Sequence, residues 1–225
     1  MKHAALVCTL IMLWLSGCAS QPRRVSPPPA ITTTSSIPAE QGSFRPDANL
    51  YLCPNATITN ALESDGRNRV LNFNPVVLVE GKVVLTPVPV NNACLTSGFG
   101  RRFGRTHEGL DLQSKPPETV YAAAPGIIRE ASTSSGFGNH LVIDHGQGIY
   151  TRYGHLDHFA SGIYEGARIG FGQPLGVMGQ TGNATGIHLH FEVLTGNYNN
   201  PRRSFGLTAH NPLSFPAYTG QSSGS

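Results

Sequence analysis

The chain has 225 residues, of which 26 are glycine and 17 are proline, and only 13% of its residues are charged. Many glycines and prolines with few charges favour turn-rich β structure over helices. The formal net charge of +3 is small and no long run of Lys and Arg occurs, which argues against a nucleic-acid partner.

Residues 1–17 resemble a bacterial lipoprotein signal peptide. An apolar run from Ala4 to Leu15 is short for a bilayer span, and Leu15-Ser16-Gly17-Cys18 resembles a lipobox. By this resemblance, cleavage before Cys18 leaves a lipidated cysteine that anchors the protein to a membrane. A transmembrane anchor is the alternative. Ala19 in the second mature position implies an outer-membrane lipoprotein on the periplasmic side of a Gram-negative cell.

Residues 18–44 are predicted to be a disordered tether that begins at the lipidated cysteine. The segment is rich in Pro, Ser and Thr, and includes Pro27-Pro28-Pro29 and Thr32-Thr33-Thr34-Ser35-Ser36. Such a composition buries too little apolar surface to offset the entropy of ordering the chain. It therefore predicts an extended link between the membrane and the folded part.

Residues 45–94 are predicted to form a small β-containing pre-domain or a wrap around the main domain. Val76–Val79 and Lys82–Leu85 flank Glu80-Gly81, a pattern typical of a β-hairpin with a tight turn. No chemistry is visible in this segment.

Two cysteines remain once Cys8 leaves with the leader and Cys18 is acylated. These are Cys53 and Cys94, an even pair in an exported protein. We expect them to form a disulfide that closes a loop of about 40 residues. Two unpaired buried thiols are the alternative.

Residues 95–216 are predicted to form a mainly β domain, an antiparallel sheet with an active-site groove on one face. Residues 217–225 are predicted to be a flexible tail. No stretch has a convincing 3.6-residue apolar period. Apolar alternation and glycine-bearing turns predict strands at 119–124, 126–133, 139–144, 149–156, 174–180 and 188–194.

The last of these strands carries two histidines, His188 and His190, two residues apart. Residues i and i+2 of a strand point to one face, so both imidazoles project into the same space while Leu189 and Phe191 face a core. The two imidazoles can be one metal ligand and one acid/base group, or two ligands. Glu192 shares their face and either supports a ligand or, as we favour, is solvated at the strand end.

Two further sequences supply possible partners for these histidines. His107 and Asp111 are four residues apart in a glycine-containing segment that we interpret as a loop able to turn both side chains inward. His155 lies near a strand end, and alternation places it on the same face as Tyr153. Each pattern is weak by itself, since isolated His and Asp residues are often surface or capping residues.

The combined pattern resembles the M23 family of zinc peptidases, the lysostaphin and LytM-type peptidoglycan endopeptidases. The pattern is His107-x3-Asp111, then His155, then His188-x-His190. The likeness covers about residues 95–215 and extends to further motifs in the same order. These are Ser97-Gly98-Phe99-Gly100-Arg101-Arg102, Val120-Tyr121-Ala122-Ala123, the run from Gly138 to Gly146, Gly172-Gln173-Pro174-Leu175-Gly176, Gly179-Gln180-Thr181-Gly182 and Asn211-Pro212-Leu213.

This resemblance implies a zinc-dependent endopeptidase that hydrolyses the peptide cross-links of peptidoglycan by metal-activated water. It implies one Zn²⁺ per chain held by His107, Asp111 and His190, with His155 and His188 as the catalytic histidines. Three N/O ligands leave a fourth tetrahedral position for water. An imidazole outside the metal shell can take the proton and another can stabilise the oxyanion, and the sequence leaves open which does which.

Two other functions remain open. Some relatives in this superfamily lack ligands and act as non-enzymatic activators of cell-wall amidases, and a structural zinc lipoprotein would need a fourth protein ligand. All five expected residues are present and no fourth ligand stands out, which favours the enzyme. A regulatory protein partner is compatible with each function. Four further histidines are not expected to bind the metal, namely His140, His145, His158 and His210.

Overall fold

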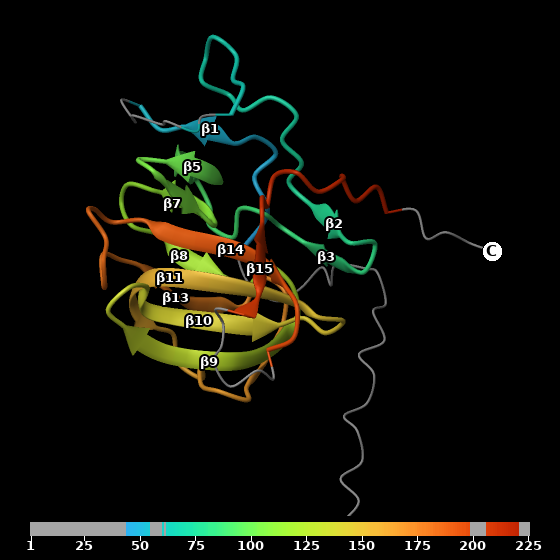
Figure 1. The fold of residues 1–225 in the computed structure, drawn as a ribbon, viewed down its shortest axis with the longest axis vertical. Coiled ribbons are helices and arrows are strands. Elements are labelled where there is room, and N and C mark those ends of the chain that lie inside the picture. The colour runs from blue at the N-terminus through green and yellow to red at the C-terminus, as the bar shows by residue number, and fades with distance from the viewer. Residues whose placement is uncertain (1–43, 55–59, 61, 199–205, 221–225) are drawn as a thin grey trace, which may run out of the picture. The chain divides into compact units, whose positions relative to one another are not determined.

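The computed structural model describes residues 44–54, 60, 62–198 and 206–220, which form a mostly β fold (Figure 1). The predicted fold class, a mainly β protein built on a largely antiparallel sheet, is confirmed. Within the described residues, no helix has the length and apolar character needed to cross a membrane. The predicted signal peptide, the lipidation site Cys18 and nearly all of the predicted tether lie outside the described residues.

Fifteen strands occur in the described ranges. The first seven are β1 (Tyr51–Leu52), β2 (Val77–Val79), β3 (Val83–Leu85), β4 (Cys94–Ser97), β5 (Gly100–Arg102), β6 (Arg105–His107) and β7 (Leu110–Gln113). The others are β8 (Thr119–Tyr121), β9 (Gly126–Ser134), β10 (Gly138–Asp144), β11 (Ile149–Phe159), β12 (Arg168–Ile169), β13 (Pro174–Met178), β14 (Leu189–Thr195) and β15 (Thr208–His210).

Eleven strands form one sheet, in which eight follow the order β1-β4-β7-β14-β11-β10-β9-β12. Strand β15 pairs with β14, and β13 pairs with both β11 and β8. Pairing is parallel only between β1 and β4. Figure 1 shows β14 between β7 and β11, so three strands that are distant in sequence lie side by side.

Strand β14 shows how the two-residue period of a strand separates core from site. Leu189, Phe191 and Val193 are fully buried in the hydrophobic core. His190 and Glu192 alternate with them and therefore point to the opposite face of the sheet. The predicted division of this segment between a core face and a polar face is present in the structure.

The N-terminal segment at residues 45–94 contributes to the same core as the main sheet. Leu50, Val79 and Leu85 are almost completely buried and belong to one cluster with sheet residues such as Leu110. Burial of apolar side chains is the main stabilising term in folding, about 1.5–3 kcal/mol for each fully buried Val or Leu. This segment is therefore held to the main sheet by hydrophobic packing.

The predicted hairpin of this segment is formed by β2 and β3, which pair antiparallel. Glu80 and Gly81 both have positive φ, 47° and 69°. Consecutive residues of this kind are typical of tight hairpin turns, whose twist matches that of the strands. Val77 in β2 also bridges to Ala217, a residue of the predicted tail at 217–225.

The six strands predicted from alternation correspond to β8, β9, β10, β11, β13 and β14. The prediction of a loop from His107 to Asp111 is wrong, because His107 ends β6 and Asp111 lies in β7. His158 and His210 lie in β11 and β15. Strand β7 depends on β14, a partner distant in sequence, so no local pattern identifies it.

A buried hydrogen-bond network connects His145, which follows β10, to residues of β11. Its Nδ1 donates to the carbonyl of Pro125 at 2.7 Å, so its Nε2, 2.8 Å from the Thr151 hydroxyl, accepts. The Thr151 and Tyr153 hydroxyls share a hydrogen bond of 3.0 Å, and the Ala123 N–H donates to Tyr153 at 2.9 Å. Burial, only partly offset by the bond to Pro125, lowers the pKa of His145 to about 4. The folded protein therefore keeps this imidazole neutral.

This network predicts a loss of stability on acidification. Above pH 6.5, His145 is neutral in both states and adds no pH dependence. Between pH 6.5 and 4 the unfolded chain takes a proton there and the folded chain does not, so the free energy of unfolding falls by about 3 kcal/mol. In His145→Gln, the free energy of unfolding measured with urea should fall by about this amount less between pH 6.5 and 4 than in the wild type. Equal pH dependence in the two proteins would contradict the prediction.

Candidate metal centre

Three potential metal ligands, His107, Asp111 and His190, meet at one point of the sheet. Asp111 in β7 is the direct antiparallel partner of His190 in β14. His107 ends β6, shortly before β7 begins. One ligand atom from each residue lies within 4.8 Å of the other two, and all three side chains are buried. We call these three residues the ligand triad.

The ligand atoms of the triad contact one another directly. Asp111 Oδ1 lies 3.0 Å from His107 Nε2 and 2.9 Å from His190 Nδ1. The two imidazole nitrogens are 3.1 Å apart. Two nitrogens and one carboxylate oxygen are among the ligand atoms that zinc prefers, and together they form a set of three rather than a closed set of four.

The outer nitrogens of the two triad histidines fix their tautomers. His107 Nδ1 lies 2.6 Å from the carbonyl oxygen of Gly98, which can only accept, so Nδ1 carries the proton. His190 Nε2 likewise lies 2.8 Å from Glu192 Oε1. His107 Nε2 and His190 Nδ1 are then left to direct lone pairs at the space beside Asp111. This arrangement fits a metal cation, because three electron-rich atoms converge there.

The electrostatics of the triad also favour a cation. Burial penalises the charge of Asp111, but when protons on His107 and His190 take the place of a cation, their hydrogen bonds outweigh this penalty and hold the pKa of the carboxyl far below its usual range. Burial likewise lowers the pKa of His190, but the carboxylates of Asp111 and Glu192 outweigh it and raise this pKa to about 9. The site therefore stabilises positive charge.

The connection from β6 to β7 approaches β14 so closely that it needs glycine at position 109. A Cβ on Gly109 would lie 2.4 Å from the Phe191 carbonyl oxygen and 3.0 Å from both His190 Cε1 and Glu192 Cγ. Contacts this short are not tolerated between real atoms, so a side chain at Gly109 would push β7 away from β14. Gly109 thus allows Asp111 to sit opposite His190.

Two further histidines, His155 and His188, lie beside the triad. Their ring centroids are 4.7 Å apart, and the His155 ring is 5.9 Å from that of His190. Nδ1 of each donates to a backbone carbonyl at 2.8 Å, that of Thr181 for His155 and that of Gly186 for His188. Each therefore keeps its Nε2 available, and His188 Nε2 lies 3.5 Å from Asp111 Oδ1.

Burial, reinforced by the nearby histidines, lowers the pKa of His155 to about 4 although the Thr181 carbonyl opposes the shift. This imidazole is therefore neutral at pH 7. A neutral imidazole with a free Nε2 can accept a proton from a reacting group.

The prediction that His155 shares a face with Tyr153 is wrong. Tyr153 is fully buried in the core against Phe191, with ring centroids 5.3 Å apart, whereas His155 points to the triad. The reason is a local break in the strand, because His155 has a positive φ of 62°. Positive φ is uncommon for residues other than glycine and is often found at functional sites.

Sequence reasoning missed the roles of three charged residues around the triad. Arg102 Nη1 lies 2.8 Å from Asp111 Oδ2, so it binds the carboxylate oxygen that faces away from the histidines. Glu192, which we expected to be solvated, is only 1% exposed and contacts His190. Arg152 in turn pairs with Glu192. An arginine among the apolar and uncharged polar residues at the start of β11 was the available signal, since a buried charge requires a partner.

The remaining histidines have surroundings away from the triad. His140 Nε2 lies 2.9 Å from Glu130 Oε1, and His145 belongs to the buried network behind β11. His158 is exposed, and His210 is half-buried in β15. Among the described residues, the only cluster that could hold a metal is the triad.

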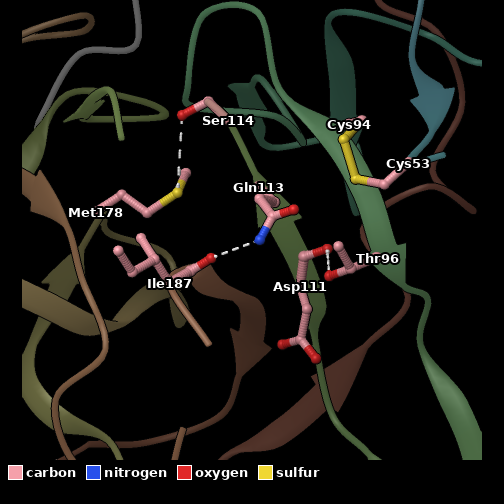
Figure 2. Close-up of a disulfide and its surroundings, with 8 residues drawn as sticks. All are labelled: Cys53, Cys94, Thr96, Asp111, Gln113, Ser114, Met178 and Ile187. Carbon is pink, nitrogen blue, oxygen red and sulfur yellow. Dashed lines mark hydrogen bonds between the residues drawn. A yellow bond between two sulfur atoms is a disulfide. The ribbon is translucent and has the colours of Figure 1, made fainter. Parts of the chain in front are cut away.

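The structure contains a disulfide between Cys53 and Cys94, whose sulfurs join the end of β1 to the start of β4 (Figure 2). Strand β4 pairs with β7, and the Thr96 hydroxyl donates to the backbone oxygen of Asp111 at 3.0 Å. Figure 2 also shows the Gln113 side chain reaching the carbonyl of Ile187, a distance of 3.0 Å. The strand that carries Asp111 is therefore held on both sides.

Part of this chain is similar to curated proteins, two of which are named here. The DD-carboxypeptidase/endopeptidase Mpg of Neisseria meningitidis is 36% identical over 107 residues, which cover 44% of this chain and 24% of that protein. The peptidoglycan DD-endopeptidase ShyB of Vibrio cholerae is 36% identical over 118 residues, 48% of this chain and 27% of that protein. The matched part spans about a quarter of the length of these relatives.

A solved structure and a family model agree with these relatives. A zinc containing peptidase from Vibrio cholerae superposes with a TM-score of 0.52 at 28% identity, over 64% of this chain and 47% of that chain. Residues 105–201 match the model of peptidase family M23, a range that includes all three triad residues as well as His155 and His188. The chain therefore contains a domain of peptidase family M23.

Proposed function

We propose that this protein is a zinc-dependent endopeptidase that hydrolyses the peptide cross-links of peptidoglycan. The observation that carries the proposal is the convergence of His107 Nε2, Asp111 Oδ1 and His190 Nδ1 beside two further imidazoles. The named activities of the relatives, one of which is a peptidoglycan DD-endopeptidase, support the class of substrate. The matched family supports hydrolysis of a peptide bond.

The residues of the site have complementary tasks in this reaction. The triad would hold zinc through two nitrogens and one oxygen and leave a position open, as in catalytic zinc sites. Zinc bound there supplies Lewis acidity for hydrolysis of an amide. His155 presents an Nε2 that can accept a proton, and His188 presents a second Nε2 that, once protonated, can donate to the substrate oxygen or return the proton to the leaving amine.

Digestion of purified sacculi tests this function. The full chain, purified in detergent and loaded with zinc, should convert cross-linked muropeptides to uncross-linked ones, as identified by mass spectrometry. A chelator should stop the release and added zinc should restore it. His158→Ala should behave like the wild type, because His158 is an exposed histidine outside the triad. Absence of release by the zinc-loaded wild type would refute the proposal.

The same experiment separates the two competing functions. An activator of cell-wall amidases would release nothing alone, but would increase the release of whole stem peptides when an amidase is added. A structural zinc lipoprotein would bind zinc and change neither reaction. A closed structural site normally has four protein ligands, whereas the metal cluster of the described chain has three.

We also propose that the protein is an outer-membrane lipoprotein facing the periplasm, anchored through Cys18. Cys18→Ala should abolish acylation and processing, because the modified thiol is lost, and should remove the protein from the outer-membrane fraction. Membrane fractionation and mass spectrometry of the mature N-terminus measure this. Cys8→Ala is the matched control, since Cys8 lies within the predicted leader. Unchanged outer-membrane fractionation of Cys18→Ala would refute the anchor.

A further inference from the structure

A buried ion pair lies directly behind the triad residue His190. Arg152 in β11 and Glu192 in β14 face each other as antiparallel partners, with Nη1 and Oε2 2.5 Å apart. Arg152 is 2% exposed and Glu192 is 1% exposed. Taking two charges out of water costs several kcal/mol per ion, and a buried pair is often no more stabilising than apolar residues of similar volume. Fold stability alone is therefore a weak reason for this pair.

The geometry of Glu192 indicates a second role. One carboxylate oxygen, Oε2, binds Arg152, and the other, Oε1, accepts the hydrogen bond from His190 Nε2 at 2.8 Å. The proton on Nε2 leaves the lone pair of His190 on Nδ1, which lies 2.9 Å from Asp111 Oδ1. Glu192 thus determines which nitrogen of His190 faces the other ligands.

The surroundings leave little freedom for these side chains to rotate. The guanidinium of Arg152 lies over the Phe137 ring, 4.4 Å from its centroid, and the same ring lies 5.8 Å from that of His190. Gly109 also approaches both His190 and Glu192, so closely that a Cβ would not fit. Contacts with Phe137 and Gly109 therefore restrict the rotation of His190 and its carboxylate partner.

We propose that Glu192, held by Arg152, is a positioning residue that orients His190 as a metal ligand and thereby sets the zinc affinity of the triad. The inference rests on the proposed zinc site. Residues that accept a hydrogen bond from a ligating histidine typically change metal affinity by about 10–100-fold when replaced. Glu192 acts through His190, while Arg152 acts through Glu192.

Zinc affinity of the full chain, measured by competition with a chromophoric chelator, tests the proposal. Glu192→Gln keeps the side-chain volume, but its amide has a single oxygen to accept hydrogen bonds from both Arg152 and His190. It should therefore weaken zinc binding about 10–100-fold. The double variant Arg152→Met/Glu192→Met removes both buried charges together, so it avoids an unpaired charge. It should also bind zinc about 10–100-fold more weakly, because His190 Nε2 loses its acceptor.

Glu130→Gln is the matched control. Glu130 Oε1 lies 2.9 Å from His140 Nε2 on neighbouring strands, so it is a similar carboxylate–histidine pair outside the triad. This variant should keep wild-type zinc affinity. Thermal unfolding in the presence of a chelator shows whether each variant folds. If the double variant does not fold, the zinc affinity of Glu192→Gln alone tests the proposal.

The outcomes separate this inference from the proposed function. If the wild type binds no zinc, the zinc site itself is refuted and the inference falls with it. If the wild type binds zinc and Glu192→Gln binds it equally tightly, the inference alone is overturned. Weakening in Glu130→Gln as large as that in Glu192→Gln would also overturn it, because the effect would not depend on contact with a ligand.

Discussion

Alanine at His107, Asp111 or His190 will remove both bound zinc and peptidase activity. Each substitution deletes one of three ligand atoms that lie within 4.8 Å of one another, and two remaining ligands do not make a zinc site of useful affinity. Elemental analysis after dialysis into metal-free buffer should give one zinc per wild-type chain and a large loss in each variant. Retention of zinc and activity by all three variants would place the metal elsewhere.

Alanine at His155 or His188 is the matched test at the same site. Both histidines donate Nδ1 to backbone carbonyls and present Nε2 beside the triad, but the three ligands remain when either is removed. Zinc content should therefore stay at the wild-type level while turnover falls by roughly 10²–10⁴-fold. If His188→Ala loses its metal and His190→Ala keeps it, the assignment of ligand and catalytic histidine between these two positions is reversed.

The sequence was most informative where periodicity and turns are local. The alternation of Leu189, Phe191 and Val193 with His190 and Glu192 predicted the orientation of β14, and the structure has that orientation. The β2–β3 hairpin was equally accessible, because its turn residues and its flanking apolar strands are adjacent in the chain. Both predictions rest on patterns within a few consecutive residues.

The sequence was least informative where pairing is long-range. Strand β7 exists because Asp111 and its neighbours pair with β4 on one side and β14 on the other, and β14 is some 80 residues away. Nothing in a short glycine-containing segment encodes that partner. The left-handed backbone of His155 is similarly set by its surroundings, including the bond from its N–H to the Phe137 carbonyl at 2.7 Å.

The burial of Glu192 was a second feature that the local sequence pattern did not predict. Glu192 lies on the polar face of β14, and a polar face is usually solvated. Here the approach of Gly109 and the guanidinium of Arg152 cover it, so the carboxylate is buried and becomes a partner of His190. The family resemblance identified the ligands by position, but this supporting contact required the packing of β11, β14 and the connection from β6 to β7.

Removal of the Cys53–Cys94 disulfide will lower the free energy of unfolding by about 4 kcal/mol, since the bond closes a loop with a sequence separation of 41 residues. The bond also holds β1, which pairs with β4 over only two residues, Tyr51 and Leu52. Urea unfolding of Cys53→Ser/Cys94→Ser measures the loss. Reduction of the wild type should give the same value, and the double variant should not respond to reductant.

Zinc content should distinguish this loss of stability from damage to the site. Strand β4 pairs with β7 at Asp111 itself and at the two residues that follow it, and the Thr96 hydroxyl binds the Asp111 backbone independently of the disulfide (Figure 2). The folded double variant should therefore still bind one zinc at 25 °C, although its unfolding midpoint is lower. Peptide mapping without reduction should find Cys53 and Cys94 linked in the wild type. Free thiols at both positions, or a stability unaffected by reductant, would contradict the prediction.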